Sequence, residues 1–175
     1  MKSAEQRQIL NAWLERHRGL IFKVVRAYTR NHQDSEDLFQ EIALQLWLSI
    51  PGYRGDCAET TWIYRVAFFA AARWSRKEVR RRETLDEEPV SAAILSPGRT
   101  PEDPRVTWLY EQIGRLREAD RSLILLQLDG HSYREIGEIL GLNESAVGVR
   151  LTRLKANLTK KLQQGDESWT EKTFK

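Results

Sequence analysis

The sequence has little cysteine and little histidine, and both shortages exclude kinds of site. A single cysteine, Cys57, cannot form a disulfide within the chain and is too few for a cysteine-based zinc site. Such a chain suits a reducing compartment, so we expect a cytoplasmic location. The three histidines, His17, His32 and His131, lie far from one another in the sequence. We therefore expect no metal site and no cofactor.

Long hydrophobic runs are also missing. The start, MKSAEQRQILNAWLERHRGL, is charged throughout, and no segment is long enough to cross a bilayer. We therefore expect no signal peptide and no membrane insertion. The chain also lacks a glycine-rich phosphate loop and a nucleophile elbow, which argues against an enzyme.

Proline is scarce and is concentrated in one stretch. Four of the five prolines lie in ETLDEEPVSAAILSPGRTPEDPR, which also mixes serine and glycine with acidic side chains. Helical periodicity stops there, and a structureless loop of this length is uncommon inside a compact domain. We expect residues 83–105 to form an extended acidic linker.

The remaining sequence indicates helices throughout. A chain of 175 residues, 41% hydrophobic and 30% charged, can form one domain or two small ones. Apolar side chains recur at helical spacing on both sides of the linker. The expected fold is all-α, with one small helical domain in residues 1–82, a second in residues 106–165, and a tail in residues 166–175.

Capping residues predict where several helices begin. Asp34 is expected to cap a helix that ends near residue 50, and Thr60 or Thr61 to cap one that ends near residue 82. After the linker, the apolar spacing predicts helices near 106–117 and 120–128.

The stretch SYREIGEILGLNESAVGVRLTRL, residues 132–154, has the pattern of a helix-turn-helix. Ser132 and Glu135 form a capping box, and Gly141 allows the left-handed backbone that ends the first helix. Asn143 can cap the second helix. Gly137 is expected where the helices cross, because a side chain there would hold them apart. An ordinary helical hairpin is the alternative, but the exposed arginines of the second helix favour DNA binding.

The stretch TTWIYRVAFFAAARWSRKEVRRR has two faces when it is projected as a helix. The apolar face, assigned to the core, contains Ile63, Val66, Ala67, Ala70 and Trp74. The opposite face interleaves aromatic rings with cations: Trp62, Arg65, Phe69, Arg73, Arg76, Lys77 and Arg80. Cations neutralise phosphates and aromatic rings stack on unpaired bases, so this face predicts contact with a partly unpaired strand. The alternative is that the rings pack against a neighbouring helix and the arginines are solvated.

The stretch DSEDLFQEIALQLWLSI begins acidic and amphipathic and then carries apolar side chains that point in several directions. One core cannot cover all of them. Either this helix is central in its domain, or part of its surface binds a protein partner.

Together these stretches resemble the bacterial RNA polymerase sigma factors, specifically the small two-domain extracytoplasmic-function (ECF) group of the sigma-70 family. The resemblance rests on DSEDLFQEIALQLW, on YRGDCAETTWIYRVA followed by a basic helix, and on LREADRSLILLQLDGHSYREIGEILGLNESAVGVRLTRLKANL, in the family's order. It implies a factor that binds core RNA polymerase and directs promoter recognition and strand opening. It also implies promoter DNA and an anti-sigma protein as partners.

The resemblance implies a role for particular residues. Core polymerase would be bound through Asp37, Gln40, Glu41, Leu44 and Trp47. The minus-ten promoter element, with one base flipped from the duplex, would be bound by Tyr53, Arg54, Asp56, Thr61, Trp62, Tyr64, Arg65, Phe69, Arg73, Arg76, Lys77 and Arg80. The minus-thirty-five element would be bound in its major groove by Tyr133, Asn143, Glu144, Ser145, Gly148, Val149, Arg150 and Arg153. The acidic linker would thread polymerase channels that otherwise hold nucleic acid.

Three positions depart from the family pattern, which often has asparagine at Phe69, an acidic or polar residue near Arg73 and a basic residue at Gly148. Base readout is therefore expected to differ, with Arg150 and Arg153 as the main contacts of the second helix.

The main alternative is a helix-turn-helix regulator that acts without core polymerase, although it would not explain the aromatic and basic face or the acidic linker. A third possibility is an adaptor that binds polymerase without recognising a promoter.

Overall fold

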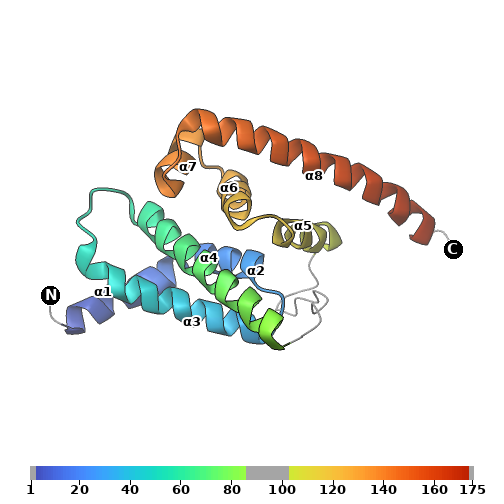
Figure 1. Cartoon of the computed structure of the whole chain (residues 1–175). Helices are drawn as coiled ribbons and strands as arrows, with labels where there is room; N and C mark the ends of the chain where they lie inside the picture. The colour runs from blue at the N-terminus through green and yellow to red at the C-terminus, as the bar shows by residue number, and fades with distance from the viewer. Residues whose placement is uncertain (1–2, 86–102, 174–175) are drawn as a thin grey trace.

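The computed structural model describes residues 3–85 and 103–173, and these residues form helices and no strand (Figure 1). In chain order the elements are α1 (Ser3–Arg16), α2 (Arg18–Tyr28), α3 (His32–Ser49), the 3-10 turn η1 (Ile50–Gly52), α4 (Glu59–Leu85), α5 (Pro104–Gly114), α6 (Glu118–Leu128), α7 (Tyr133–Leu140) and α8 (Glu144–Thr173). The expected all-α fold is confirmed. The expected linker, 83–105, lies largely outside the described residues. None of the described helices is long and apolar enough to span a membrane.

Helices α1 to α4 form the N-terminal half, in which α3 and α4 pack along one another and α2 contacts both. Leu38, Ile42 and Leu46 are fully buried, and their four-residue spacing places them on one face of α3. The facing side chains of α4, Ile63 and Ala67, are fully buried as well. This apolar contact fixes the position of α4, which carries most of the expected minus-ten residues.

Helices α5 to α8 form the C-terminal half. Five successive residues of α6, Ser122 to Leu126, are buried, so the middle of this helix is covered on all sides. Helix α7 packs on α8 and on α6, and its Ile136 and Ile139 are buried there. Helix α8 continues well beyond these contacts as a single long helix (Figure 1).

The two halves pack against each other, because α2 and α4 contact α5, α6 and α7. The Tyr28 hydroxyl donates a hydrogen bond to the Glu118 carbonyl oxygen at 2.8 Å and lies 2.9 Å from the Ser122 hydroxyl. Burial raises the pKa of Tyr28 to about 12, so the hydroxyl remains a neutral donor at ordinary pH. A second contact joins α2 to α5, since the Arg26 guanidinium lies 3.9 Å from the centre of the Tyr110 ring.

Several helices begin earlier than the sequence predicts. The expectation that Asp34 caps α3 is wrong: Asn31 is the cap, and its side-chain oxygen accepts a hydrogen bond from the Asp34 amide at 2.7 Å. The Asn31 amide group in turn donates to the Asp34 carboxylate at 2.9 Å, so the two side chains are hydrogen-bonded to each other's residue. Helix α4 begins at Glu59, ahead of the expected threonine caps. Helix α5 begins at Pro104, a favoured first residue, after an Asp103 cap.

Candidate nucleic-acid interface

The helix-turn-helix begins with the capping box that the sequence predicts. The Glu135 amide donates to the Ser132 hydroxyl at 3.3 Å, and the Ser132 amide donates to the Glu135 carboxylate at 2.7 Å. The Ser132 hydroxyl and amide both bond to the carboxylate and hold the pKa of Glu135 below its usual value. The charged carboxylate also lies in the first turn of α7, where the helix dipole favours it.

Two glycines set the geometry of the turn. A Cβ atom on Gly137 would lie 2.5 Å from the Leu142 carbonyl oxygen, so only glycine allows this approach of the backbones. Gly141 has a φ angle of 70°, in the left-handed region that glycine adopts without strain. After the turn, the Asn143 side chain accepts a hydrogen bond from the Ala146 amide at 2.7 Å and caps α8. The predicted roles of these glycines and of the cap are confirmed.

Most of the residues expected to bind the minus-thirty-five element lie on an exposed surface at the start of α8. We call this surface the α8 face, and it consists of Asn143, Glu144, Ser145, Val149 and Arg153. It is accessible to a partner in this structure because α6 and α7 pack on the buried side of α8. Its binding to DNA stays a prediction.

The other three expected residues have partners within the C-terminal half. The ring of Tyr133 lies over Gly148, where an added Cβ atom would be 3.4 Å from two ring carbons. The ammonium of Lys155 is 5.9 Å from the centre of the same ring. The Arg150 guanidinium forms an ion pair with the Asp120 carboxylate of α6, with a nitrogen-to-oxygen distance of 2.8 Å. Arg150 therefore has a structural role beside the DNA contact that we predict for it.

At the start of α4, Trp62 packs into an aromatic cluster. Its indole nitrogen donates a hydrogen bond to the Ser49 hydroxyl at 3.0 Å, and its ring centre lies 5.5 Å from that of Tyr53. The Tyr53 ring also contacts Trp13, edge to face, and its hydroxyl donates to the Cys57 carbonyl oxygen at 2.9 Å. For Trp62, therefore, packing against neighbouring residues is what the structure shows.

The aromatic cluster anchors a loop between η1 and α4. Arg54 and Asp56 are exposed in this loop, on either side of Gly55, whose φ angle of 80° turns the chain. Thr61, in the first turn of α4, is half-buried. Two of the expected minus-ten residues are therefore presented at the tip of a loop whose base is packed.

Further along α4, Phe69 is 68% exposed, although it is an aromatic residue in the middle of a long helix. Arg73 and Lys77, four and eight residues on, are also exposed and have no ion pair among the described residues. Arg80 is exposed and has a partner of its own. We call Phe69, Arg73 and Lys77 the α4 face. Unlike Trp62, this ring does not pack into a core.

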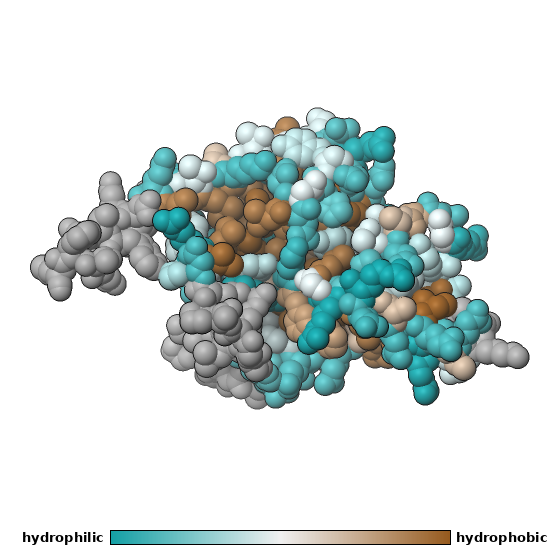
Figure 2. Space-filling model, turned by 180° about the vertical axis from the view of Figure 1, so that it is seen from behind, coloured by the Kyte–Doolittle hydropathy of each residue, from teal (hydrophilic) through white to brown (hydrophobic). Residues whose placement is uncertain are grey.

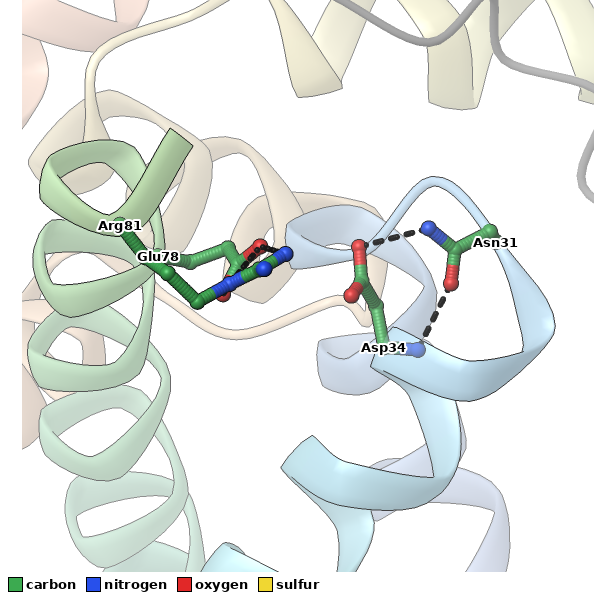
Figure 3. A network of polar contacts seen from close by, with 4 residues as sticks. All are labelled: Asn31, Asp34, Glu78 and Arg81. Carbon is green, nitrogen blue, oxygen red and sulfur yellow. Dashed lines mark hydrogen bonds and ion pairs between the residues drawn. The ribbon is translucent and has the colours of Figure 1, made fainter. Parts of the chain in front are cut away.

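The last described side chains of α4 lie near the start of α3. Arg81 binds Glu78 with both Nε and one terminal nitrogen, the latter at 2.7 Å. Figure 3 shows this pair pointing toward the Asn31–Asp34 cap of α3. The positive charge of Arg81 is thus balanced by a carboxylate on its own helix.

Two other cations of α4 are bound by the C-terminal half. A terminal nitrogen of Arg65 donates to the Glu138 carbonyl oxygen at 2.7 Å, close to the end of α7. Arg76 forms an ion pair with Glu118, the first residue of α6, at 2.8 Å. The carbonyls at a helix C-terminus carry partial negative charge, so both arginines have anionic or partly anionic partners. The expected nucleic-acid face is therefore partly covered.

Tyr64, also expected at the minus-ten element, is buried between the halves and donates a hydrogen bond to Asp129. Burial and the Asp129 carboxylate raise its pKa, which keeps the hydroxyl protonated. Asp129 also binds the ammonium of Lys23 from α2, and His131 contacts the Tyr64 ring edge to face. Periodicity could not find this cluster, since its members come from three separate segments.

The α3 surface expected to bind polymerase is partly exposed. Leu44, Asp37 and Gln40 are exposed, whereas Glu41 and Trp47 are half-buried. Leu48, which the sequence analysis did not select, is also exposed one turn beyond Leu44. The helix is central in its half and still keeps apolar side chains in solvent. Binding of a protein partner at this surface stays a prediction. Seen from behind the view of Figure 1, the mostly hydrophilic surface of the molecule also carries apolar patches (Figure 2).

Comparison with known families matches both halves. Residues 13–81 match the family model of sigma-70 region 2, and residues 107–158 match that of sigma-70 region 4. Among proteins of similar sequence, the ECF RNA polymerase sigma-E factor of Escherichia coli K12 is 25% identical over 142 residues, which cover 74% of each chain. The ECF RNA polymerase sigma-E factor of Haemophilus influenzae is 23% identical over 169 residues, which cover 90% of this chain and 89% of that protein.

Two solved structures share the fold. A sigma factor RpoE in complex with the anti-sigma factor NepR, from Bartonella quintana, superposes with a TM-score of 0.72 at 17% identity, covering 87% of this chain and 96% of that one. CnrH in complex with the cytosolic domain of CnrY superposes with a TM-score of 0.65 at 19% identity, covering 90% of each chain.

Proposed function

The chain belongs to the ECF group of the sigma-70 family of RNA polymerase sigma factors, and from this membership we propose how it divides promoter binding between its halves. As a sigma factor it is a transcription initiation factor and not an enzyme: it binds core RNA polymerase and directs promoter recognition and strand opening. In our proposal residues 1–82 bind polymerase and the minus-ten element, and residues 106–165 bind the minus-thirty-five element. Residues 83–105 link them, and residues 166–175, most of which continue α8, are a tail.

The observation that carries this division is the placement of two exposed, chemically different faces on α4 and α8. The α4 face has an aromatic ring beside cations, which suits unpaired bases and their phosphates. The α8 face lies on the second helix of a helix-turn-helix, the element that enters the major groove of a duplex. One half thus suits an opened strand, and the other suits closed duplex.

For the minus-thirty-five element, we propose that the α8 face lies in the groove with Arg153 as its cation. Arg150 lies about two turns from the start of this face and is held by Asp120, so it would position α8 as well as contact phosphate. Tyr133, at the first turn of α7, would lie toward the DNA backbone.

For the minus-ten element, we propose that Phe69 stacks on a base that has left the duplex. Flipping a base costs a few kcal/mol, and one stacking contact offsets about 1–3 kcal/mol of that. Arg73 and Lys77 would neutralise phosphates on the same strand. The loop with Arg54 and Asp56 would complete the site, because the aromatic cluster anchors its base.

For core polymerase, we propose a surface on α3 that combines acidic and apolar side chains. Asp37 and Gln40 would form its polar rim, and Leu44 its apolar centre. Exposed Leu48 extends the apolar part by one turn. Interfaces of this kind combine an apolar centre with a polar rim.

We also propose an anti-sigma protein as a partner and the cytoplasm as the location. In two solved structures of this fold the similar chain is bound to a partner: the sigma factor RpoE to the anti-sigma factor NepR, and CnrH to the cytosolic domain of CnrY. A single thiol without a disulfide partner fits a reducing compartment, where polymerase and promoter DNA are found.

The test is reconstitution. The purified chain is mixed with core RNA polymerase and genomic fragments, and the transcript starts are sequenced, with core polymerase alone as the control. We expect new starts that share upstream minus-ten and minus-thirty-five elements. If the chain forms no complex with core and binds duplex DNA alone, it is a helix-turn-helix regulator instead.

A further inference from the structure

The α8 face has an apolar side chain at its centre, and we propose that Val149 recognises the methyl group of a thymine in the minus-thirty-five element. This inference rests on the proposed function, since it identifies one base contact of the surface that we propose for that element.

Val149 is an apolar side chain that is exposed and does not belong to the core. Its side chain is 50% exposed, whereas Val147 and Leu151, on the other side of α8, are fully buried. Ser145 and Arg153 lie one turn before and one turn after Val149 and are also exposed, so the three form one stripe along the helix. An apolar group therefore lies between two polar groups on the surface presented to DNA.

The residues next to Val149 in α8 place no polar side chain at the centre of this stripe. Gly148 has no side chain, and the ring of Tyr133 covers it. Arg150 is bound to Asp120. The Thr152 hydroxyl donates to the Gly148 carbonyl oxygen at 2.9 Å, within its own helix. Hydrogen-bond readout is consequently confined to the two ends of the stripe, and its centre can only make apolar contact.

Thymine is the base that such a centre can select. In the major groove each base pair presents a distinct pattern, and the C5 methyl group of thymine is the apolar feature of that pattern. A valine side chain that packs on this methyl group removes apolar surface of both partners from water. The other bases present hydrogen-bonding groups or bare ring edges there, which the isopropyl group cannot satisfy.

The test removes the methyl group from the DNA. Holoenzyme, made from the full chain and core polymerase, first selects promoters from genomic fragments. Each thymine of the recovered minus-thirty-five element, on either strand, is then replaced in turn by deoxyuridine, which lacks only the methyl group. We expect one replacement to weaken binding by about fourfold, the factor expected for one buried methyl group.

The matching protein change is Val149→Ser. It should weaken binding to the thymine promoter and abolish the difference between thymine and deoxyuridine at that one position. Val106→Ser is the control, because Val106 is also a valine on a helix of the same half and is 38% exposed, but lies on α5. Valine and serine have similar helix propensities, so both variants should fold.

Each outcome decides the proposal. It is overturned if the element contains no thymine, if no deoxyuridine replacement weakens binding, or if the sensitivity persists in Val149→Ser. The variant Arg153→Gln distinguishes failure of the thymine contact from failure of the proposed function. If Arg153→Gln weakens binding while the methyl group has no effect, the α8 face binds DNA and only the thymine contact is wrong. If neither change matters, the proposed minus-thirty-five surface is wrong as well.

Discussion

The hydroxyl of Tyr64 on α4 donates a hydrogen bond to the carboxylate of Asp129, the residue that follows α6. The same carboxylate binds the ammonium of Lys23 on α2. One acidic side chain of the C-terminal half thus holds two helices of the N-terminal half. Near it, Arg65 bonds to the end of α7. The packing of the halves therefore uses residues of the expected minus-ten surface.

We expect Tyr64→Phe to weaken the packing of the two halves by about 1 kcal/mol, the net contribution of a typical internal hydrogen bond. Small-angle scattering over a series of salt concentrations measures the separation of the halves. As salt weakens the ion pairs between them, the radius of gyration of Tyr64→Phe should rise at a lower salt concentration than that of the wild type. Tyr53→Phe is the matched control, because the Tyr53 hydroxyl bonds to Cys57 within one loop. Identical curves for Tyr64→Phe and the wild type would contradict the expectation.

Gly137→Ala should destabilise the C-terminal half by about 1–3 kcal/mol, because its Cβ atom would meet the Leu142 carbonyl oxygen at 2.5 Å. Urea unfolding at equilibrium gives the change in the free energy of unfolding. The control is Gly114→Ala at the end of α5, where an added Cβ atom meets nothing within 4 Å. The idea fails if the two alanine variants are equally stable.

The capping box predicts a pH dependence. The folded pKa of Glu135 lies below its usual 4.5, so the carboxylate stabilises α7 above that value, and this contribution is lost as the pH falls through the folded pKa. Glu135→Gln should therefore be less stable than the wild type near pH 7, and the difference should shrink in acid. Urea midpoints measured between pH 7 and pH 3 give the comparison. A profile for Glu135→Gln that runs parallel to that of the wild type would count against the idea.

Phe69→Ala should impair promoter opening more than the binding of closed duplex. The ring is exposed, so its removal leaves the core intact and removes about 1–3 kcal/mol of stacking on an unpaired base. Permanganate reactivity of promoter thymines in the holoenzyme complex measures opening. Phe22→Ala is the control, since that ring is also exposed but lies on α2. Equal reactivity in Phe69→Ala and the wild type would rule out this role.

The helix-turn-helix could be predicted almost residue by residue, because its signals are local. A capping box, a crossing glycine and a left-handed glycine each act within a few positions of the chain. The start of α3 was mispredicted because Asn31 and Asp34 both make good caps, and only the backbone conformation decides between them. Local signals therefore predict the presence of a helix better than its first residue.

The packing between the halves could not be predicted, because it depends on contacts between distant residues. Periodicity placed Ile63, Ala67 and Ala70 in the core correctly, but Tyr64 and Phe68 are buried too. Helix α4 is covered on a wider arc than one core requires, since α6 and α7 contact it from the other half. A helical projection contains no information about a second neighbour of this kind.

The contacts that join the halves include many hydrogen bonds and ion pairs, such as Arg76 with Glu118 and Lys23 with Asp129. When such groups separate, they exchange protein partners for water and expose less apolar surface than unfolding does. Heat capacity rises mainly with exposed apolar area, so separation of the halves should have a smaller heat-capacity change than complete unfolding. Temperature should then affect the separation of the halves weakly, whereas dissolved ions should affect it strongly. We therefore expect a polyanion to separate the two halves without melting either of them.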